Sequence, residues 1–156
     1  MKTRGEKVIQ LSKEVIKWLS PLSTKIEIAG SIRRGKQNPG DIDIVLIPKN
    51  IDKLTEFLKK KGKFIQGGNE KSTWKIKGIK VELYYADNLN EWGSMLLAYS
   101  GKSGSNIGLK IIARTKGFKL TQHGLFNRKT GKYLVGRTER EIYKALNREY
   151  KEPWER

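Results

Sequence analysis

One stretch of the chain decides the fold, and from Gly30 to Leu46 it reads GSIRRGKQNPGDIDIVL. Its second half opens the segment Asp41–Ile47, which is mostly apolar and predicts a largely buried strand that ends at Pro48. Asp41 and Asp43 are two residues apart, so their side chains project from the same face of that strand, while the isoleucines beside them point into the core. The strand therefore presents two carboxylates on one patch.

Two like charges on one patch repel each other unless a cation neutralises them. Oxygen ligands suit Mg²⁺ or Mn²⁺, and these ions usually complete their coordination with water and substrate phosphates. An Asp-x-Asp pair taken alone is also compatible with two solvated edge residues, so the pattern needs context.

The first half of the stretch provides that context. Gly30 lets the backbone approach an anion closely, Ser31 supplies a hydroxyl and exposed N–H groups, and Arg34 can grip a phosphate with its forked guanidinium. Surface turns often have this composition, but here it leaves a predicted strand, Lys25–Ala29, just before the carboxylate strand. A phosphate grip beside a metal-binding pair favours a triphosphate site.

The amino-acid composition excludes several classes of metal and catalytic site. The 156 residues contain no Cys and one His, which excludes thiolate zinc sites, iron–sulfur clusters and thiol nucleophiles and argues against His-based metal sites and Ser-His-Asp triads. The formal net charge is +17, which indicates a polyanionic partner, most often nucleic acid. A Lys-rich solubilising surface is the alternative, but such a surface mixes signs.

The distribution of charge favours nucleic acid. Between Glu91 and Glu139 there is no carboxylate, whereas basic residues recur throughout, at Lys102, Lys110, Arg114, Lys116, Lys119, Arg128, Lys129, Lys132 and Arg137. Lys110 and Arg114 are one helical turn apart and predict a DNA-facing stripe.

Periodicity predicts an α+β chain of two lobes, a mixed sheet with helices in residues 1–88 and a smaller basic lobe in residues 89–156. Helices are expected at 8–19, 51–61, 89–99, 106–116 and 138–146, and strands at 25–29, 41–47, 64–66, 73–76, 79–85, 118–120 and 133–135, with a Gly-Ser linker at 100–105. No apolar run is long enough for a membrane span and no signal peptide is evident, so we expect a cytoplasmic protein with no membrane partner. We also expect a monomer.

The chain resembles a known family through several short motifs. Gly30-Ser31-x-Arg33-Arg34-Gly35 followed by Gly40-Asp41-Ile42-Asp43 is similar to the nucleotidyltransferase signature of family X DNA polymerases, the group of DNA polymerase beta. Tyr99-Ser100-Gly101, the segment 116–126 and the closing segment 138–153 continue the likeness, in the minimal form of small viral members.

The resemblance implies a nucleotidyltransferase palm and a C-terminal lobe that closes over the incoming nucleotide. It places two Mg²⁺ ions, or Mn²⁺, at catalytic Asp41, Asp43 and Glu82. It assigns nucleotide binding to Gly30, Ser31, Arg34, Gly40, Tyr99, Gly101 and Asn106, and together with the charge pattern it assigns DNA binding to Lys102, Lys110, Arg114 and Lys116.

Three departures from the family pattern stand out. Glu82 replaces the family's third Asp, Ala98 replaces an aromatic residue beside the sugar-discriminating turn, and no N-terminal lyase domain is expected. The implied function is template-directed addition of dNTPs to a primer 3′-hydroxyl on primer-template or gapped DNA, in repair or replication. Two alternatives stay open: a template-independent or RNA-directed nucleotidyltransferase, and a non-catalytic nucleic-acid-binding protein with a decayed palm.

Overall fold

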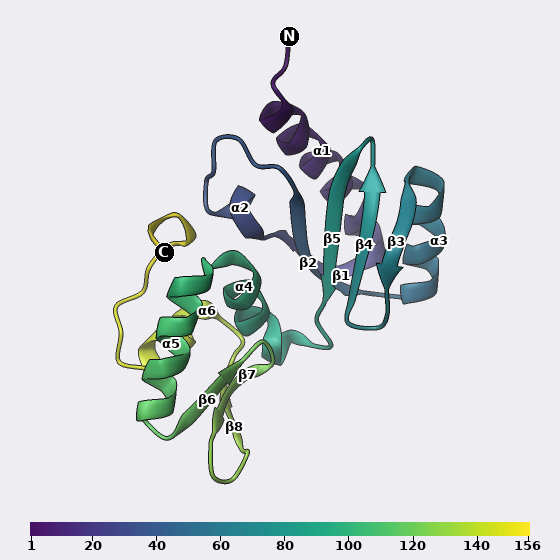
Figure 1. The fold of residues 1–156 in the computed structure, drawn as a ribbon. Helices are drawn as coiled ribbons and strands as arrows, with labels where there is room; N and C mark the ends of the chain where they lie inside the picture. Colours follow the sequence, from purple (N-terminus) through teal and green to yellow (C-terminus); the bar gives the residue numbers. More distant parts are fainter. The chain divides into compact units, whose positions relative to one another are not determined.

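A five-stranded sheet forms the centre of the first of two units into which the chain divides in the computed structural model, which describes residues 1–156. The first unit is Met1–Ala86 and the second is Asp87–Arg156, a division beside the boundary expected after Asn88. The first unit contains α1 (Arg4–Leu19), β1 (Ser23–Ile28), α2 (Gly30–Arg33), β2 (Ile42–Pro48), α3 (Ile51–Lys61), β3 (Lys63–Gly67), β4 (Lys71–Ile76) and β5 (Ile79–Tyr85), with a 3₁₀ turn at Ser20–Leu22 (Figure 1).

The sheet of the first unit has the strand order β1-β2-β5-β4-β3. Only β2 and β5 run parallel; the other neighbouring pairs are antiparallel. The mixed α+β architecture expected from the sequence is therefore confirmed.

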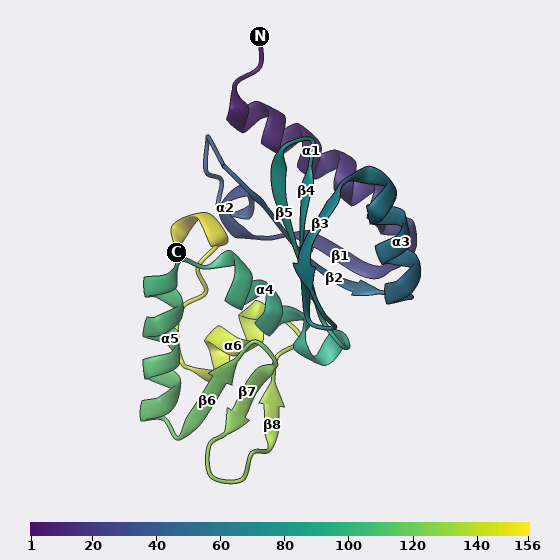
Figure 2. The same cartoon turned by 45° about the vertical axis from the view of Figure 1, so that its right-hand side comes forward.

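Two amphipathic helices cover one side of this sheet (Figure 2). In α1, Val8, Leu11, Val15 and Leu19 recur at helical spacing and are buried, and Leu54 and Leu58 do the same in α3. They pack on alternate residues of β2 and β5, such as Ile42, which the sequence pattern assigned to the core, and Leu83. Asn50 caps α3, because its side chain accepts from the Lys53 N–H at 3.0 Å.

The segment after β1 differs from the expected turn. Gly30 to Arg33 form one turn of helix, α2, closed by hydrogen bonds from the Arg33 and Arg34 N–H groups to the carbonyls of Ala29 and Gly30. Gly30 has φ +61, a left-handed value that a residue with a side chain rarely adopts, so the sharp entry into α2 requires glycine.

The second unit packs helices on a small antiparallel sheet of order β6-β7-β8. Its elements are a 3₁₀ turn at Leu89–Glu91, α4 (Trp92–Ser100), α5 (Ser103–Thr115), β6 (Phe118–Thr121), β7 (Gly124–Asn127), β8 (Tyr133–Val135), α6 (Glu139–Ala145) and a closing 3₁₀ turn at Pro153–Glu155. Its core joins Leu97 of α4, Leu109 and Ala113 of α5, Leu125 of β7 and Ile142 of α6.

Two predictions for this unit were wrong. The helix α5 begins at Ser103, inside the predicted Gly-Ser linker, because Leu109 and Ala113 bury one face of the helix and packing outweighs the low helix propensity of Ser and Gly. The central strand β7 was missed, since the two-residue connection at Gln122 and His123 lacks the usual hairpin-turn residues.

None of the helices is both long enough and apolar enough to span a bilayer.

Candidate active site

Two of the predicted carboxylates, Asp43 and Glu82, lie on the face of the first sheet that is turned away from α1 and α3. Ile42 and Ile44 of β2 and Val81 of β5 belong to the core beneath the helices, so alternation along the strands turns Asp43 and Glu82 to the opposite face. Asp43 and Glu82 are also partners in the parallel register of β2 and β5. Residues distant in sequence thereby become neighbours on one surface.

A tyrosine hydroxyl joins these two carboxylates. The hydroxyl oxygen of Tyr84 lies 2.6 Å from Glu82 Oε2 and 3.1 Å from Asp43 Oδ1. Because one phenol carries one proton, it donates to only one carboxylate at a time, and the shorter distance favours Glu82. Burial and the nearby carboxylates raise the pKa of Tyr84, so the hydroxyl remains a donor.

Two lysines complete the surroundings of Glu82, which is itself buried. Lys80 Nζ lies 2.7 Å from Oε1 and Lys71 Nζ lies 2.9 Å from Oε2. Burial by itself would raise the pKa of Glu82, but the hydrogen bonds from Lys80, Tyr84 and Lys71 lower it to about 2. Glu82 is therefore an ionised carboxylate whose charge is compensated within the protein.

The pKa of Asp43 is shifted in the opposite direction to that of Glu82. Burial raises the pKa of Asp43, the charges of Glu82 and Asp41 raise it further, and the Tyr84 hydroxyl opposes this increase. Asp41 is exposed and precedes β2, which begins at Ile42, so it stands at the entrance of the strand and not within it as expected. Ionised Asp43 is thus short of positive charge, the condition that a bound cation relieves.

The glycine turn fits closely against Asp43. A Cβ at Gly30 would collide with the Asp43 carboxylate, with the Asp43 Cβ and Cγ both at 2.9 Å. The Ala29 N–H also donates to the Asp43 carbonyl at 2.8 Å. Ser31 and Arg34 lie at and just after α2 and are partly exposed, and Gly40 is exposed with open space around it. The first residue of the predicted phosphate-binding turn, Gly30, therefore lies directly against Asp43.

The carboxylates suit a divalent cation in chemistry but are not assembled into a complete ligand set. No group of three or more His, Asp or Glu side chains is arranged to hold a metal. Asp43 lacks a cationic partner at short range, and Thr73 Oγ1, which belongs to the residue paired with Glu82 across β4 and β5, is buried without a hydrogen-bond partner. Hard oxygen donors of this kind fit Mg²⁺ or Mn²⁺, provided that Glu82 exchanges a lysine for the ion.

The other predicted nucleotide-binding residues belong to the second unit. A Cβ at Gly101 would collide with the Asn106 side chain, so the end of α4 and the start of α5 fit closely. Asn106 Nδ2 donates to the carbonyl of Ala98 at 3.1 Å, while its Oδ1 is buried without a partner. Asn106 also lines a small cavity of about 60 Å³ together with Lys110 and Gln122. The amide is thus held in place with one acceptor unused.

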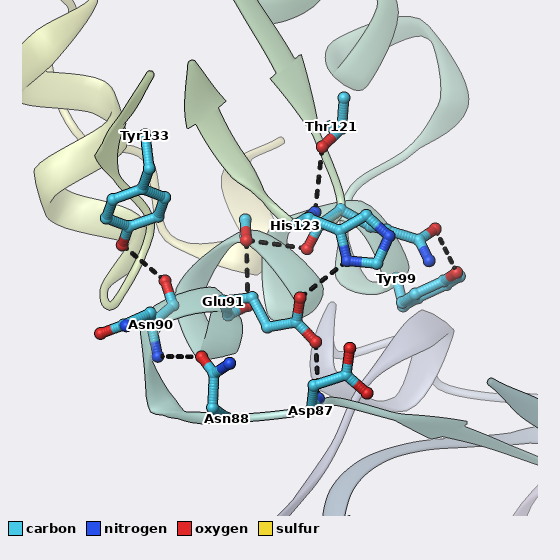
Figure 3. A network of polar contacts seen from close by, with 10 residues as sticks. Asp87, Asn88, Asn90, Glu91, Tyr99, Thr121, His123 and Tyr133 are labelled. Atoms are coloured by element: carbon cyan, nitrogen blue, oxygen red, sulfur yellow. Dashed lines mark hydrogen bonds and ion pairs between the residues drawn. The ribbon is translucent and has the colours of Figure 1, made fainter. Parts of the chain in front are cut away.

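Tyr99 belongs to a polar network that ties the start of the second unit to the turn between β6 and β7 (Figure 3). Its hydroxyl donates to Gln122 Oε1 at 2.8 Å. Next in that turn, His123 Nδ1 lies 2.7 Å from Glu91 Oε2, and the other Glu91 oxygen accepts from the Asp87 N–H at 2.6 Å. His123 therefore has a carboxylate partner within the protein.

The predicted DNA-binding residues Lys102, Lys110, Arg114 and Lys116 are all exposed and lie in or beside α5. Lys102 precedes the helix, Lys110 and Arg114 occupy adjacent turns, and Lys116 ends it. Lys110 and Arg114 share one face of α5, since residues four apart in a helix do so, and the DNA contact expected of this stripe stays a prediction.

Comparison with known proteins identifies both units. Residues 4–76 match the family model of the DNA polymerase beta palm, and residues 95–156 match the DNA polymerase beta thumb. The chain belongs to the family X DNA polymerases. It is accordingly a nucleotidyltransferase of the DNA polymerase class, and enzymes of this family use divalent metal ions.

Two curated relatives agree with this assignment. Repair DNA polymerase X of African swine fever virus is 25% identical over 170 residues, which cover 99% of this chain and 97% of the viral protein. DNA polymerase IV of Saccharomyces cerevisiae is 39% identical over 70 residues, which are 45% of this chain and 12% of the yeast protein. The chain thus matches the viral protein along nearly its whole length and a short part of the yeast one.

The palm contains site residues that the sequence interpretation missed, namely Lys71, Lys80 and Tyr84. Alternation alone could have found two of them, because Lys80, Glu82 and Tyr84 are spaced by two in β5 and must share a face. Lys71 required the register of β4, in which it pairs with Tyr84.

Proposed function

We propose that this family X polymerase is template-directed, adds dNTPs to a primer 3′-hydroxyl, and fills short gaps in DNA during repair or replication. The observation that carries the proposal is the pairing of Asp43 with Glu82 across β2 and β5, with Gly30 fitted against Asp43. A phosphate-binding turn and two strand carboxylates on one surface are what nucleotidyl transfer requires.

The palm residues would have two different roles, metal binding and triphosphate binding. Asp41, Asp43 and Glu82 would hold two Mg²⁺ ions, or Mn²⁺, which when bound activate the primer hydroxyl and stabilise the departing pyrophosphate. The amides of Gly30 and Ser31 and the guanidinium of Arg34 would grip the triphosphate of the dNTP, with Gly40 leaving room for it.

Lys71 and Lys80 have a part in this scheme. Their side chains are 47% and 51% exposed, so each can leave Glu82 for solvent or for a DNA phosphate without crossing the core. Tyr84 would keep Glu82 oriented during that exchange, because its buried hydroxyl lies 2.6 Å from Glu82 Oε2. The lysines would therefore neutralise Glu82 until the metal and the substrate arrive.

The thumb residues would hold the nucleotide base and the DNA. Asn106 supports a role at the incoming base, since its buried Oδ1 lacks a partner and can accept from a ligand. Tyr99 and Gly101 frame the same segment, and Lys102, Lys110, Arg114 and Lys116 would contact phosphates of primer-template or gapped DNA. We propose a monomer for this complex.

One observation favours the non-catalytic alternative: Glu82 is already paired with two lysines, Lys71 and Lys80.

A primer-extension assay distinguishes the proposed polymerase from the two alternative functions. We expect dNTP addition on a one-nucleotide gap with the templated base, and little addition to a single-stranded DNA or RNA end or from NTPs. Equal addition to untemplated ends would identify a terminal transferase, and DNA binding without any addition in Mg²⁺ or Mn²⁺ would identify a decayed palm.

A further inference from the structure

The first turn of α1 contains a glycine against which the loop between α2 and β2 packs closely (Figure 1). Gly5 is buried, and a Cβ added there would collide with the Asn38 side chain and would lie 2.7 Å from the Asn38 Cα. A side chain can rotate away from such a contact, but a Cα atom moves only with its backbone. The loop, residues 35–40, therefore lies at a separation from α1 that only glycine at position 5 allows.

Helix formation does not explain this glycine. Gly5 is the second residue of α1, and glycine is less favourable than alanine in a helix. Its φ is not positive, so the backbone conformation does not require glycine either. The close contact with Asn38 is the one feature of the fold that a side chain at position 5 would disturb.

The loop depends on packing because hydrogen bonds hold only its beginning. The N–H groups of Gly35 and Lys36 each donate to a carbonyl of α2 at 2.9 Å. Residues 37–40 make no backbone–backbone hydrogen bond. Pro39 is nevertheless buried, so this part of the loop is held in place by the surfaces on which it packs.

The helix α1 is held more firmly than the loop. Its apolar face is buried in the palm core. The Arg4 guanidinium also donates to the carbonyl of Gly78 at 3.3 Å, and Glu14 pairs with Lys77 at 3.1 Å, so two side chains tie the helix to the turn between β4 and β5. A Cβ at position 5 would therefore displace the loop rather than the helix.

We propose that Gly5 is a positioning residue for nucleotide binding, because it lets the loop lie against α1 and so fixes Arg34, at one end of the loop, relative to Asp41, at the other. The inference rests on the proposed function, which assigns Arg34 to the triphosphate and Asp41 to a metal ion. Gly5 is buried and acts only through the loop. A displacement of about 1 Å in such a segment can cost up to about 100-fold in rate.

A purely structural role for Gly5 predicts a different kinetic result. If Gly5→Ala only lowered the fraction of folded protein, the maximal rate would fall and the KM for dNTP would stay the same, because the folded molecules would bind nucleotide normally. If the variant displaces the loop, bound nucleotide draws the loop back into place. The KM then rises and the maximal rate changes little.

The test uses a gapped duplex whose primer ends in a dideoxynucleotide, so that dNTP binds in Mg²⁺ without reacting. Gly5→Ala should weaken dNTP binding about tenfold, the loss expected for one charge-assisted contact. In extension of an ordinary primer the KM should rise by the same factor, while the maximal rate and DNA affinity stay near those of the wild type. The matched control is Gly68→Ala in the turn between β3 and β4, where an added Cβ would meet nothing within 4 Å. It should behave as the wild type does.

A second variant keeps the inference falsifiable if Gly5→Ala folds poorly. Pro39→Gly loosens the loop from its own side and leaves α1 unaltered, so it should also weaken dNTP binding without weakening DNA binding. Unchanged dNTP binding in either folded variant would overturn the positioning role. So would a lower maximal rate with an unchanged KM in Gly5→Ala.

A spectroscopic measurement reports the loop position without nucleotide or catalysis. The chain has no Cys and Gln37 is exposed, so Gln37→Cys provides a single site for a trifluoromethyl label. Adding Gly5→Ala should shift the fluorine NMR signal of this label, and adding Gly68→Ala should not. An identical signal in the presence and absence of Gly5→Ala would overturn the inference.

These measurements separate the inference from the proposed function. A wild-type chain that neither binds dNTP nor extends primers refutes the polymerase proposal, and the fluorine signal still decides whether Gly5 positions the loop. Normal extension by the wild type, together with normal dNTP binding by Gly5→Ala and Pro39→Gly, refutes only the role of Gly5.

Discussion

The carboxylate face of the palm and the outward face of α5 in the thumb differ in how their charges are balanced. On the palm face, Glu82 is buried and paired at 2.7 and 2.9 Å with Lys80 and Lys71. On α5, Lys110 and Arg114 are exposed, and the helix contains no carboxylate. The charge of Glu82 is therefore compensated within the palm, whereas the basic face of α5 leaves compensation to a ligand.

This difference bears on the cost of preparing each surface for substrate. A buried carboxylate that loses its partners is expensive, so the palm keeps Glu82 neutralised and must exchange contacts before it holds a metal ion. Exposed cations are solvated at little cost and gain from releasing condensed counterions when they meet DNA. We therefore expect substitutions in the palm to alter chemistry and substitutions in α5 to alter DNA affinity.

The largest effect is expected at Asp43, the carboxylate that lacks a cationic partner. Asp43→Asn keeps the shape and can still accept from Tyr84 but removes the charge that would hold the metal ions. Single-turnover incorporation should fall by several orders of magnitude, while DNA affinity changes less than twofold. Asp41→Asn provides the parallel measurement. Near-wild-type incorporation by either variant would remove the carboxylate pair from the active site.

A smaller effect should separate the phosphate grip from the DNA stripe. Arg34→Ala should raise the apparent KM for dNTP about tenfold, the loss expected for one charge-assisted contact, and leave binding of DNA alone intact. Lys110→Ala/Arg114→Ala should instead weaken DNA binding and make the slope of log Kobs against log[salt] shallower by about one unit for each lost phosphate contact.

Two measurements on the same protein preparations check these predictions. Steady-state dNTP curves test the role of Arg34, and DNA titrations at several salt concentrations test the roles of Lys110 and Arg114. A variant at Arg34 that loses DNA affinity but not nucleotide use would contradict this division. A Lys110/Arg114 double variant with an unchanged salt slope would do the same.

The parts of the palm that depend on the local pattern of apolar and polar residues could be predicted from the sequence. Alternation in the strand after Asp41 correctly placed Ile42 and Ile44 in the core. The parallel register of Asp43 with Glu82 could not be derived in this way, because strand pairing is a tertiary property. Resemblance to the family supplied Glu82 as a candidate, and the register explains why it lies beside Asp43.

The sequence was insufficient where packing overrides composition. Ser103 and Gly104 read as a linker, yet they begin α5 because the rest of that helix buries Leu109 and Ala113. The exposure of two isoleucines in α5 was missed for a related reason. Ile107 and Ile111 count as ordinary core candidates in a helical pattern until the structure shows which face of α5 is covered.

The smallest effect concerns the stability of the palm as a function of pH. The folded-state pKa of Glu82 is about 2 against an ordinary value of 4.5, so its ion pairs stabilise the fold above pH 4.5 and this contribution is lost as the pH falls from 4.5 toward 2. Asp43 acts in the opposite sense, because its raised pKa makes its ionisation destabilising as the pH rises through the acidic range.

Comparison of the wild type with Glu82→Gln in EDTA isolates the Glu82 contribution. Both lysine partners are about half exposed, so solvent screens the pairs and we expect a difference of about 1 kcal/mol in unfolding free energy above pH 5. The difference should shrink steadily below pH 4.5, as measured by urea unfolding at a series of pH values. Glu82→Gln as stable as the wild type at pH 7, or a difference that persists unchanged to pH 2.5, would show that the charge of Glu82 is not compensated within the palm. The contrast with α5 would then be lost, because both regions would depend on a ligand to balance their charge.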